Sequence, residues 1–407
     1  MVMMLNPFMA AFRSDPYPAY RALREADRVM WQEMMQAWLV TGYDEVQSIL
    51  KDHAHFSSER QRASNRLIAQ LMEQQDSGVM RRTATMLSVD PPDHTRLRTL
   101  VNKAFTPRVV ERMRPHIQEI ADGLLDAVSD PARLDVVKDL AIPLPIIVIA
   151  EMLGVSPSDR EQFKAWSTDI AGVLGSAMQP QDSIQRAQSS SEELASYFSA
   201  IIEQRRKEPK DDLISGLIAA RDHGDALSED ELLATCVLLL VAGNETTTNL
   251  IGNGTLALLR HPDALRQLQD DPGIIVSAVE ELLRFDGPVQ ATSRVVLKDV
   301  EFQGRHFKAG QVVITFLGAA NHDPAQFSEP ERLDLTRADN RHVAFGHGIH
   351  FCLGAPLARV EGQVALSTLL RRFPDPEPDF DEPDWGNSFI LRGLKSLPAR
   401  SKAAASK

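Results

Sequence analysis

The sequence predicts a mainly helical protein with a small β subdomain. Apolar residues recur at three- and four-residue spacing along most of the chain, which is typical of amphipathic helices. Segments rich in β-branched residues are few and lie mostly between residues 293 and 316. The 407 residues are 43% hydrophobic and contain no repeat or long linker. We therefore expect a single domain over residues 1–407, with a frayed tail at 400–407.

The start of the chain does not resemble a targeting segment. Residues 1–18 have no basic lead and are interrupted by Asn6 and Pro7, which is unlike a signal peptide. The most apolar segments, 140–150 and 232–243, are too short to cross a membrane. Two cysteines give no disulfide framework, and a net charge of −12 argues against a nucleic-acid partner. We expect a cytoplasmic protein without a membrane anchor.

A long helix is predicted to start at Ser228. Ser228 and Glu231 form a capping-box pattern, in which each side chain accepts a hydrogen bond from the backbone of the other residue. The helix should continue through an apolar run to Arg260, just before Pro262. Periodicity alone predicts further helices over residues 107–128, 191–206 and 274–285.

The predicted strands lie in one short region. Residues 293–297, 300–304 and 311–316 are rich in β-branched side chains, and turn residues at Gly304 and Gly310 separate them. This region should form the small β subdomain.

The segment FGHGIHFCLG, residues 345–354, places a cysteine in a glycine-rich loop. A thiolate is a soft metal ligand, and backbone N–H groups at the start of a helix stabilise its charge. The glycines permit tight turns and the close approach of a flat partner. Structural zinc is excluded, because it usually takes four ligands and no second cysteine lies nearby. These residues alone leave two interpretations of Cys352: a buried cysteine in a turn, or a ligand to an external atom.

The whole pattern, Phe-Gly-x-Gly-x-His-x-Cys-x-Gly, resembles the haem-binding loop of the cytochrome P-450 family, the haem-thiolate monooxygenases. The resemblance implies that Cys352 is the axial ligand of the iron of haem b and that Phe345 packs beside its sulfur. It also places Gly346 against the haem and His350 at a haem propionate. The family fold is a single mainly helical domain, in which the haem lies between the long helix and the cysteine loop.

The segment AGNETT, residues 242–247, lies in the predicted long helix. Small residues leave room on one face of a helix, and an acid followed by an alcohol can relay protons. The segment is similar to the oxygen-activation motif of the family. The resemblance implies that Ala242 and Gly243 lie against the haem, that Thr246 hydrogen-bonds dioxygen, and that Glu245 links Thr246 to solvent protons.

Three regions supply candidate donors for the haem propionates. His94 and Arg98 are four residues apart and share a helix face, in a stretch that resembles the propionate-binding helix of the family. Arg294 occupies the position of another propionate-binding arginine. Together with His350, the resemblance implies four donors.

The family's Glu-x-x-Arg motif matches Glu281 and Arg284, which lie on one helix face. The segment at 327–335 resembles the region whose arginine completes a Glu-Arg-Arg cluster, and that arginine is expected to be Arg332. The cluster is interpreted as structural, because it holds the segment that presents the cysteine loop.

The resemblance also implies a substrate pocket and a source of electrons. A mostly apolar pocket suits a fatty acid, terpenoid, steroid or polyketide, and residues 176–191, rich in Gln and Ser, suggest a lid. Electrons from NAD(P)H should arrive through a separate ferredoxin or flavodoxin and its reductase, which would meet basic residues such as Lys103, Arg108, Arg112 and Arg341. The expected pocket residues are Met86, Leu238, Val241, Val289, Ala291, Thr292, Phe389 and Ile390.

Three functions remain in competition. A monooxygenase inserts one atom of dioxygen into the substrate, whereas a haem-thiolate peroxygenase or isomerase needs no external electrons. The Glu245–Thr246 pair argues against the peroxygenase, because peroxide-using relatives typically lose it. A non-catalytic haem sensor has no need for such a pair. The sequence therefore favours the monooxygenase.

Overall fold

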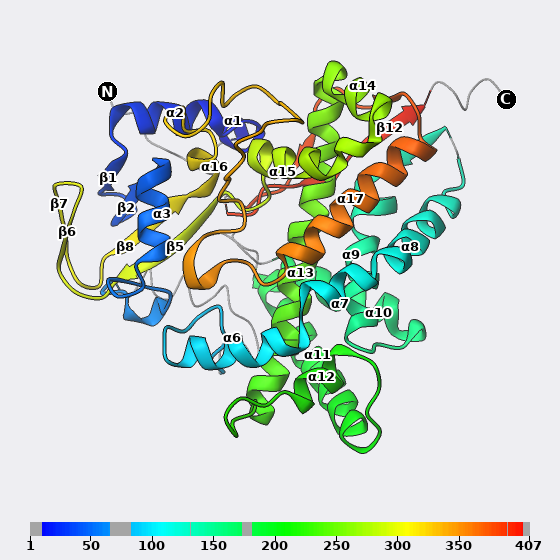
Figure 1. Ribbon diagram of the computed structural model, residues 1–407, viewed down its shortest axis with the longest axis horizontal. Helices are drawn as coiled ribbons and strands as arrows, with labels where there is room; N and C mark the ends of the chain where they lie inside the picture. The colour runs from blue at the N-terminus through cyan, green and yellow to red at the C-terminus, as the bar shows by residue number, and fades with distance from the viewer. Residues whose placement is uncertain (1–9, 66–82, 131, 173–180, 389, 402–407) are drawn as a thin grey trace.

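A computed structural model of the chain describes residues 10–65, 83–130, 132–172, 181–388 and 390–401. Helices fill one side of the molecule, and a β-rich region with a few short helices forms the other side (Figure 1). This arrangement confirms the predicted mainly helical class with a smaller β region. The helices are α1 (Ala10–Ser14), α2 (Tyr17–Ala26), α3 (Tyr43–Lys51), α6 (Asp93–Ala104), α7 (Pro107–Arg112), α8 (Arg114–Asp126), α9 (Pro143–Met152), α10 (Arg160–Ala171), α11 (Gln181–Lys207), α12 (Leu213–Ala219), α13 (Glu229–Arg260), α14 (Pro262–Asp270), α15 (Ile275–Asp286), α16 (Leu317–Ala320) and α17 (Ala355–Arg372).

Helix α13 runs through the middle of the helical side (Figure 1) and is 32 residues long. Its predicted cap is confirmed: the Ser228 hydroxyl accepts from the Glu231 backbone N–H at 3.2 Å. In return, the Glu231 carboxylate accepts from the Ser228 backbone N–H at 2.9 Å. The helix ends at Arg260, as predicted. Because it contacts α9, α11, α15 and α17, it forms the axis around which the helical side packs.

Two of the periodic segments differ in length from their prediction. The segment 107–128 is divided at Met113 into α7 and α8, because Pro115 in the first turn of α8 has no N–H to continue the preceding helix. The segment 191–206 is the second half of a longer helix, α11. The helix predicted at 274–285 is confirmed as α15.

The main sheet has five strands in the order β1-β2-β8-β5-β3. The strands predicted at 293–297 and 311–316 are confirmed as the antiparallel pair β5 and β8. The sheet is completed by earlier strands that the sequence did not predict, of which β2 pairs parallel to β8. All four residues of β2 are buried, so it lacks the alternation that signals a strand. The strands are β1 (Val29–Gln32), β2 (Ala37–Val40), β3 (Phe56–Ser57), β5 (Ala291–Val296) and β8 (Val312–Phe316).

Three smaller sheets lie outside the main one. The strand predicted at 300–304 is confirmed as β6 (Val300–Phe302), which pairs with β7 (Arg305–Phe307). Near the C-terminus, Arg400 and Ser401 belong to a paired strand and Ser401 is buried, so the chain is ordered beyond the start of the expected frayed tail. Among the described residues, two more small sheets are present. One is formed by β4 (Arg133–Asp135), β12 (Pro398–Ser401) and β9 (Pro376–Pro378), and the other by β10 (Asp384–Trp385) and β11 (Leu394–Ser396).

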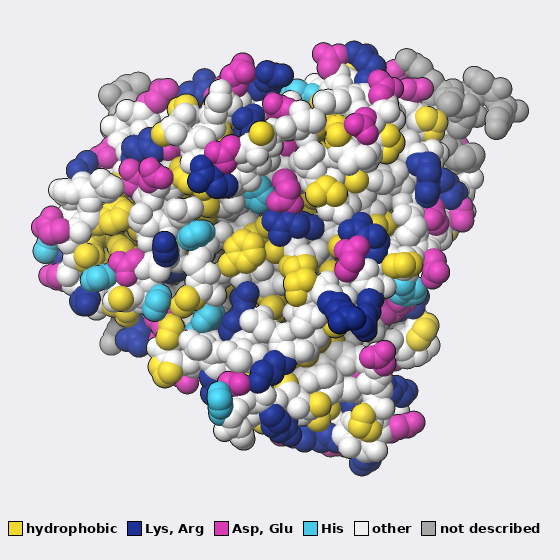
Figure 2. Space-filling model, viewed as in Figure 1, with side chains coloured by type: hydrophobic (Ala, Val, Ile, Leu, Met, Phe, Trp, Pro, Cys, Tyr) yellow, Lys and Arg dark blue, Asp and Glu magenta, His cyan; other side chains and the backbone are white. Residues whose placement is uncertain are grey.

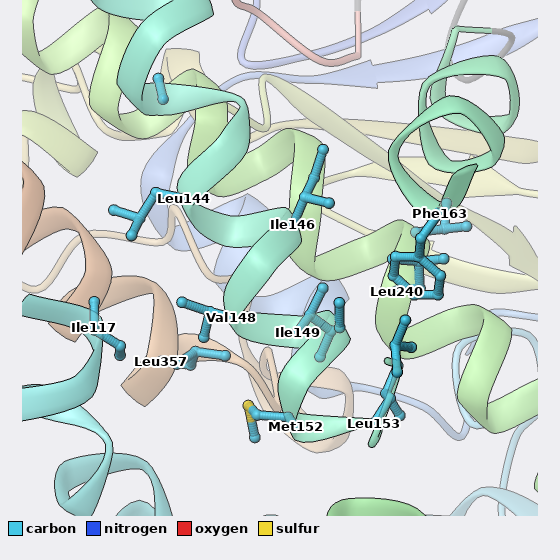
Figure 3. Close-up of a cluster of buried hydrophobic side chains, with 14 of the residues drawn as sticks. Ile117, Leu144, Ile146, Val148, Ile149, Met152, Leu153, Phe163, Leu240 and Leu357 are labelled. Carbon is cyan, nitrogen blue, oxygen red and sulfur yellow. The ribbon is translucent and has the colours of Figure 1, made fainter. Parts of the chain in front are cut away.

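The largest hydrophobic cluster lies between the helices of the helical side. Figure 3 shows Ile146 and Ile149 of α9 pointing toward α13, with Phe163 of α10 close by. Cys236 of α13 is fully buried in this cluster, and burial raises the pKa of its thiol to about 12. It packs as an apolar residue, in agreement with the absence of any motif around it.

Candidate functional site

The cysteine loop is shaped by two glycines in the left-handed region. Gly346 has a φ of +72° and Gly348 a φ of +74°, which L side chains rarely adopt. A Cβ atom on Gly348 would lie 2.5 Å from the Leu50 carbonyl oxygen, so only glycine lets the loop pass against α3. The Cys352 backbone N–H donates to the Phe345 carbonyl at 3.0 Å and closes the loop.

Cys352 lies three residues before the first residue of α17 and is accessible, although it is surrounded by protein atoms. Burial raises the pKa of its thiol, whereas backbone N–H groups of Gly354 and Ala355 and the charges of Arg98 and Arg359 act in the opposite direction. These groups stabilise a negative sulfur, as expected for a thiolate ligand. Beside it, a Cβ atom on Gly346 would meet no atom within 4 Å among the described residues.

One face of α13 is open at the segment predicted to activate oxygen. Ala242 is exposed in the middle of a helix whose other residues are mostly buried. A Cβ atom on Gly243 would also meet no described atom within 4 Å. Thr246 lies one turn on, and its hydroxyl donates to the Ala242 carbonyl at 2.9 Å. Ala242, Gly243 and Thr246 therefore border open space on the same side of the helix.

Glu245 is a partly buried acid beside this open face, and one of its carboxyl oxygens is fully buried. Its Oε2 atom has no hydrogen-bond partner among the described residues. Burial raises the pKa of its carboxyl group to about 7. Near neutral pH the group can therefore both release and accept a proton, which a relay requires.

A second buried acid, Glu361 of α17, was not predicted. It is 1% exposed, and burial raises its pKa to about 8, opposed by a hydrogen bond with Thr247 of α13. Only the structure reveals Glu361, because a single glutamate in a helical segment belongs to no sequence motif.

Replacing Glu361 with glutamine should change how stability depends on pH. An unfolded glutamate titrates near pH 4.3, so the folded protein holds an extra proton between there and about pH 8. Glu361 should therefore contribute a fall of about 1.4 kcal/mol per pH unit to the free energy of unfolding over this range, and this contribution should be missing in Glu361→Gln. Urea unfolding at pH 5 and pH 8.5 measures the difference. Parallel curves for the two proteins would contradict the neutral state of Glu361.

The four predicted propionate donors come together in space. The rings of His94 and His350 are 4.3 Å apart. Burial, together with the charges of Arg294, His94 and Arg98, lowers the pKa of His350 to about 3. Burial likewise lowers the pKa of Arg294 to about 10. His94 Nε2 is buried without a hydrogen-bond partner among the described residues. This set of buried and partly buried donors fits the two carboxylates of haem b.

Two serines and an aspartate, which the sequence did not reveal, support this set. The Ser58 hydroxyl lies 3.0 Å from His350 Nε2. Asp90 accepts from the Ser58 backbone N–H at 3.0 Å and from the Ser57 hydroxyl. These contacts orient the His350 ring, but a two-residue strand gives no signal from which they could be predicted.

The structural cluster contains a different second arginine from the one predicted. Glu281 and Arg284 form a fully buried ion pair at 2.8 Å, as expected. Arg337 completes it, because its Nε lies 3.1 Å from Glu281 Oε2 and its side chain is only 10% exposed. The Arg332 side chain is instead 63% exposed and pairs with Glu329. Arg332 contributes only its carbonyl, which accepts from Arg284 and Arg337.

The expected pocket residues divide into several groups. Val289 bridges to Leu391, so the segments that carry Val289 and Ile390 run side by side. Ala291 does not belong with them: it packs with Tyr20 and Phe316 on the other face of the sheet from Thr292, since neighbouring strand residues point to opposite faces. Phe389 and residues 176–180 of the expected lid lie outside the described residues. Met86, Leu238 and Val241 are buried in the main cluster of the helical side.

The basic residues expected to meet an electron carrier lie on α6, on α7 and in the segment before the cysteine loop. Figure 2 shows Lys and Arg side chains over α6, α7 and α17, interspersed with acidic and apolar ones. Lys103 pairs with Asp222 and Arg341 with Asp339, so the positive charge of both is offset. Arg108 and Arg112 are exposed on α7.

Comparison with known proteins identifies the family. The family model for cytochrome P-450 matches residues 27–272 and 274–390. The polyketide biosynthesis cytochrome P-450 PksS of Bacillus subtilis is 40% identical over 97% of this chain and 98% of its own length. Its solved structure superposes with a TM-score of 0.88, covering 98% of this chain and 100% of that one.

Two other similar proteins carry names that state a ligand or reaction. Vitamin D(3) 25-hydroxylase of Pseudonocardia autotrophica is 43% identical over 96% of this chain and 95% of its own length. CYP109E1 of Bacillus megaterium, solved in complex with testosterone, is 37% identical with a TM-score of 0.85, covering 95% of this chain and 99% of that one. Among the described residues, none of the helices combines the length and the apolarity that crossing a bilayer requires. The family match and the similarity to these relatives show that the chain belongs to the cytochrome P-450 family of oxygenases and is an enzyme.

Proposed function

We propose that this enzyme inserts one atom of dioxygen into a C–H or C=C bond of a large apolar molecule. The other oxygen atom leaves as water, and two electrons and two protons balance the reaction. The electrons come from NAD(P)H through a separate ferredoxin or flavodoxin and its reductase. The observation that carries the proposal is the pairing of an accessible, N–H-stabilised Cys352 with an open face of α13 that bears Glu245 and Thr246.

Each residue has a defined task in this proposal. Haem b, when bound, supplies the redox centre at which dioxygen is reduced. Cys352 would hold its iron through Sγ, while His94, Arg98, Arg294 and His350 would hold its propionates. Thr246 would hold a proton at Oγ1 beside the open face of α13. Glu245 would replace that proton from solvent, since its pKa lies near neutrality. The apolar walls would orient the substrate and exclude water.

Replacing Thr246 with alanine should uncouple electron use from product formation. Without the hydroxyl, protons reach dioxygen in the wrong order and peroxide is released. NAD(P)H consumption should therefore continue, while product per NAD(P)H falls by roughly tenfold or more. The measurement compares NAD(P)H, product and peroxide in one reaction. Thr246→Ser, which keeps the hydroxyl, is the control; full coupling in Thr246→Ala would show that Thr246 is not part of the relay.

The rate of product formation should depend on the protonation of Glu245. Its carboxyl is neutral below its pKa of about 7 and charged above it, so it donates a proton at the lower pH. Turnover should decline as pH rises through this value, and Glu245→Gln should be slow at every pH because it cannot donate. A pH–rate profile from pH 5.5 to 9 checks this. A wild-type profile that is flat around pH 7 would argue against the assignment.

The substrate is proposed to be a steroid- or polyketide-sized apolar molecule. Support comes from the names of the relatives, which concern a polyketide pathway, vitamin D(3) and testosterone. Screening steroids, macrolides and fatty acids for a low- to high-spin shift of the haem tests this class. A shift only with small polar compounds would exclude it.

A further inference from the structure

Asn244, the residue just before the acid–alcohol pair, is tied to a neighbouring helix by a buried hydrogen bond. Its Nδ2 donates to the Ser167 hydroxyl of α10 at 2.6 Å. Ser167 is 0% exposed and Asn244 is 5% exposed, so the bond is shielded from water. A shielded bond between two side chains fixes the relative position of two helices more firmly than an exposed one.

This part of α13 requires lateral support. Gly243 lowers local helix stability by about 1 kcal/mol relative to alanine. The Thr246 hydroxyl bonds back to the Ala242 carbonyl, a contact that tends to bend helices. Ala242 lies on the open face of the helix. On the sides away from that face, Asn244 bonds to Ser167, and Thr248 donates to the Ala141 carbonyl at 2.9 Å.

Ser167 stands on a firmly held pair of helices. Three hydrogen bonds join α10 or the residue before it to α11: Ser190 to Asp169 at 2.7 Å, Trp166 to Glu193 at 3.0 Å and Tyr197 to Asp159 at 2.8 Å. Helix α10 also packs directly against α13. Ser167 is therefore a fixed point from which α13 can be positioned.

We propose that Ser167 is a positioning residue, which sets the orientation of Glu245 and Thr246 through its hydrogen bond to Asn244. The role in oxygen chemistry rests on the proposed function, whereas the effect on α13 does not. Losing the bond would let the turn around Gly243 move, so that water reaches the open face and protons arrive out of order.

The test compares Ser167→Ala with Ser190→Ala in the haem-loaded enzyme. Ser190→Ala is the matched control, because it removes a similar serine hydrogen bond that joins α10 to α11 without reaching α13. Amide hydrogen exchange at residues 242–248 should become roughly tenfold faster in Ser167→Ala and stay unchanged in Ser190→Ala. Product per NAD(P)H should fall in Ser167→Ala alone. Equal exchange in both variants would overturn the proposal, whatever the enzyme oxidises.

Asn244→Ala removes the donor of the same hydrogen bond, and it takes the place of Ser167→Ala in this test if Ser167→Ala fails to bind haem. The double variant should exchange no faster than either single variant, because all three lose one bond. Additive effects would mean that the two side chains act separately, and the proposal would be wrong. Faster exchange with unchanged product per NAD(P)H would overturn the role in positioning Glu245 and Thr246.

A second inference concerns a small buried cavity near α2. It has a volume of about 20 Å³, and its lining includes Phe12 and Arg13 of α1, Tyr20 of α2, Gln290, Trp385 and Arg392. Three buried polar atoms of lining residues have no partner among the described residues: the Tyr20 hydroxyl, Gln290 Oε1 and Trp385 Nε1. The Gln290 orientation is fixed, because its Nε2 donates to the Gly287 carbonyl at 2.8 Å.

We infer that one water molecule binds in this cavity. A hydroxyl and an indole N–H can donate to it, and Gln290 Oε1 can accept from it, which matches the capacity of a single water. The volume is sufficient for one water and too small for any larger ligand. The water would join Tyr20 of α2 to Gln290 and to Trp385 of β10.

The sign of a stability change tests this inference. Tyr20→Phe should lower the melting temperature if the hydroxyl bonds to water, because a hydrogen-bonded water loses a partner. If the cavity is dry, removing an unpaired buried hydroxyl should raise the melting temperature. A high-resolution crystal structure should show one density peak between the three side chains. A raised melting temperature, or a cavity without density, would refute the water site.

Discussion

Replacing Cys352 with serine should abolish oxygen-dependent product formation. A serine hydroxyl is a hard, neutral ligand and cannot donate electron density to iron as a thiolate does, a property that favours O–O cleavage. The backbone N–H groups of Gly354 and Ala355 would remain, but they would face an oxygen that stays protonated near neutral pH. Product formation with the electron-transfer partners, measured beside haem content, checks this expectation.

Cys236→Ala provides the matched control for the cysteine. Cys236 is fully buried in the core of α13, and its thiol stays protonated because burial raises its pKa to about 12. Its loss should leave turnover intact and cost about 1 kcal/mol of stability. Retained turnover in Cys352→Ser, or complete loss in Cys236→Ala at normal haem content, would contradict the assignment of the ligand.

Replacing Arg337 with alanine should destabilise the protein strongly, whereas the same change at Arg332 should not. Arg337 contacts a Glu281 carboxylate that is 0% exposed, so its loss leaves a buried charge with one cation fewer. We expect a cost of about 3 kcal/mol. The Arg332 side chain is 63% exposed beside Glu329, and its loss should cost at most about 0.5 kcal/mol. Urea unfolding of both variants measures the difference.

The haem content of the two variants extends this comparison. Arg337 also donates to the Ser328 carbonyl at 2.7 Å, so it ties the segment ahead of the cysteine loop to α15. Arg337→Ala should therefore bind haem less tightly than Arg332→Ala. Equal stability and equal haem content in the two variants would contradict the assignment of Arg337, and not Arg332, as the second arginine of the structural cluster.

The parts of the fold that could be predicted are those with a local signal. The cap formed by Ser228 and Glu231 marks the start of α13, and β-branched runs mark β5 and β8. Strand β2 has no such signal, because its burial on both faces removes the alternation. The division of the predicted helix at Met113 follows from Pro115, and a prediction from apolar periodicity alone does not take this proline into account.

The candidate site could be predicted where a linear motif fixes the positions of its residues. His94, Arg98 and His350 meet as the motifs imply. The prediction that Arg332 completes the structural cluster is wrong. The turn after Pro330 determines that Arg337 and not Arg332 faces Glu281, and no pattern in the sequence predicts the shape of that turn. Ser167 and Glu361 belong to the surroundings of the site only through tertiary packing.

The absorption spectrum of the reduced, CO-bound protein tests the central claim most directly. A thiolate from Cys352 opposite bound CO should move the Soret band to the red-shifted position that is typical of haem-thiolate proteins. The band should be lost in Cys352→Ser and kept in Cys236→Ala. A wild-type band at the position of histidine-ligated haem, or an unchanged band in Cys352→Ser, would contradict the assignment of Cys352 as the ligand and the function built on it.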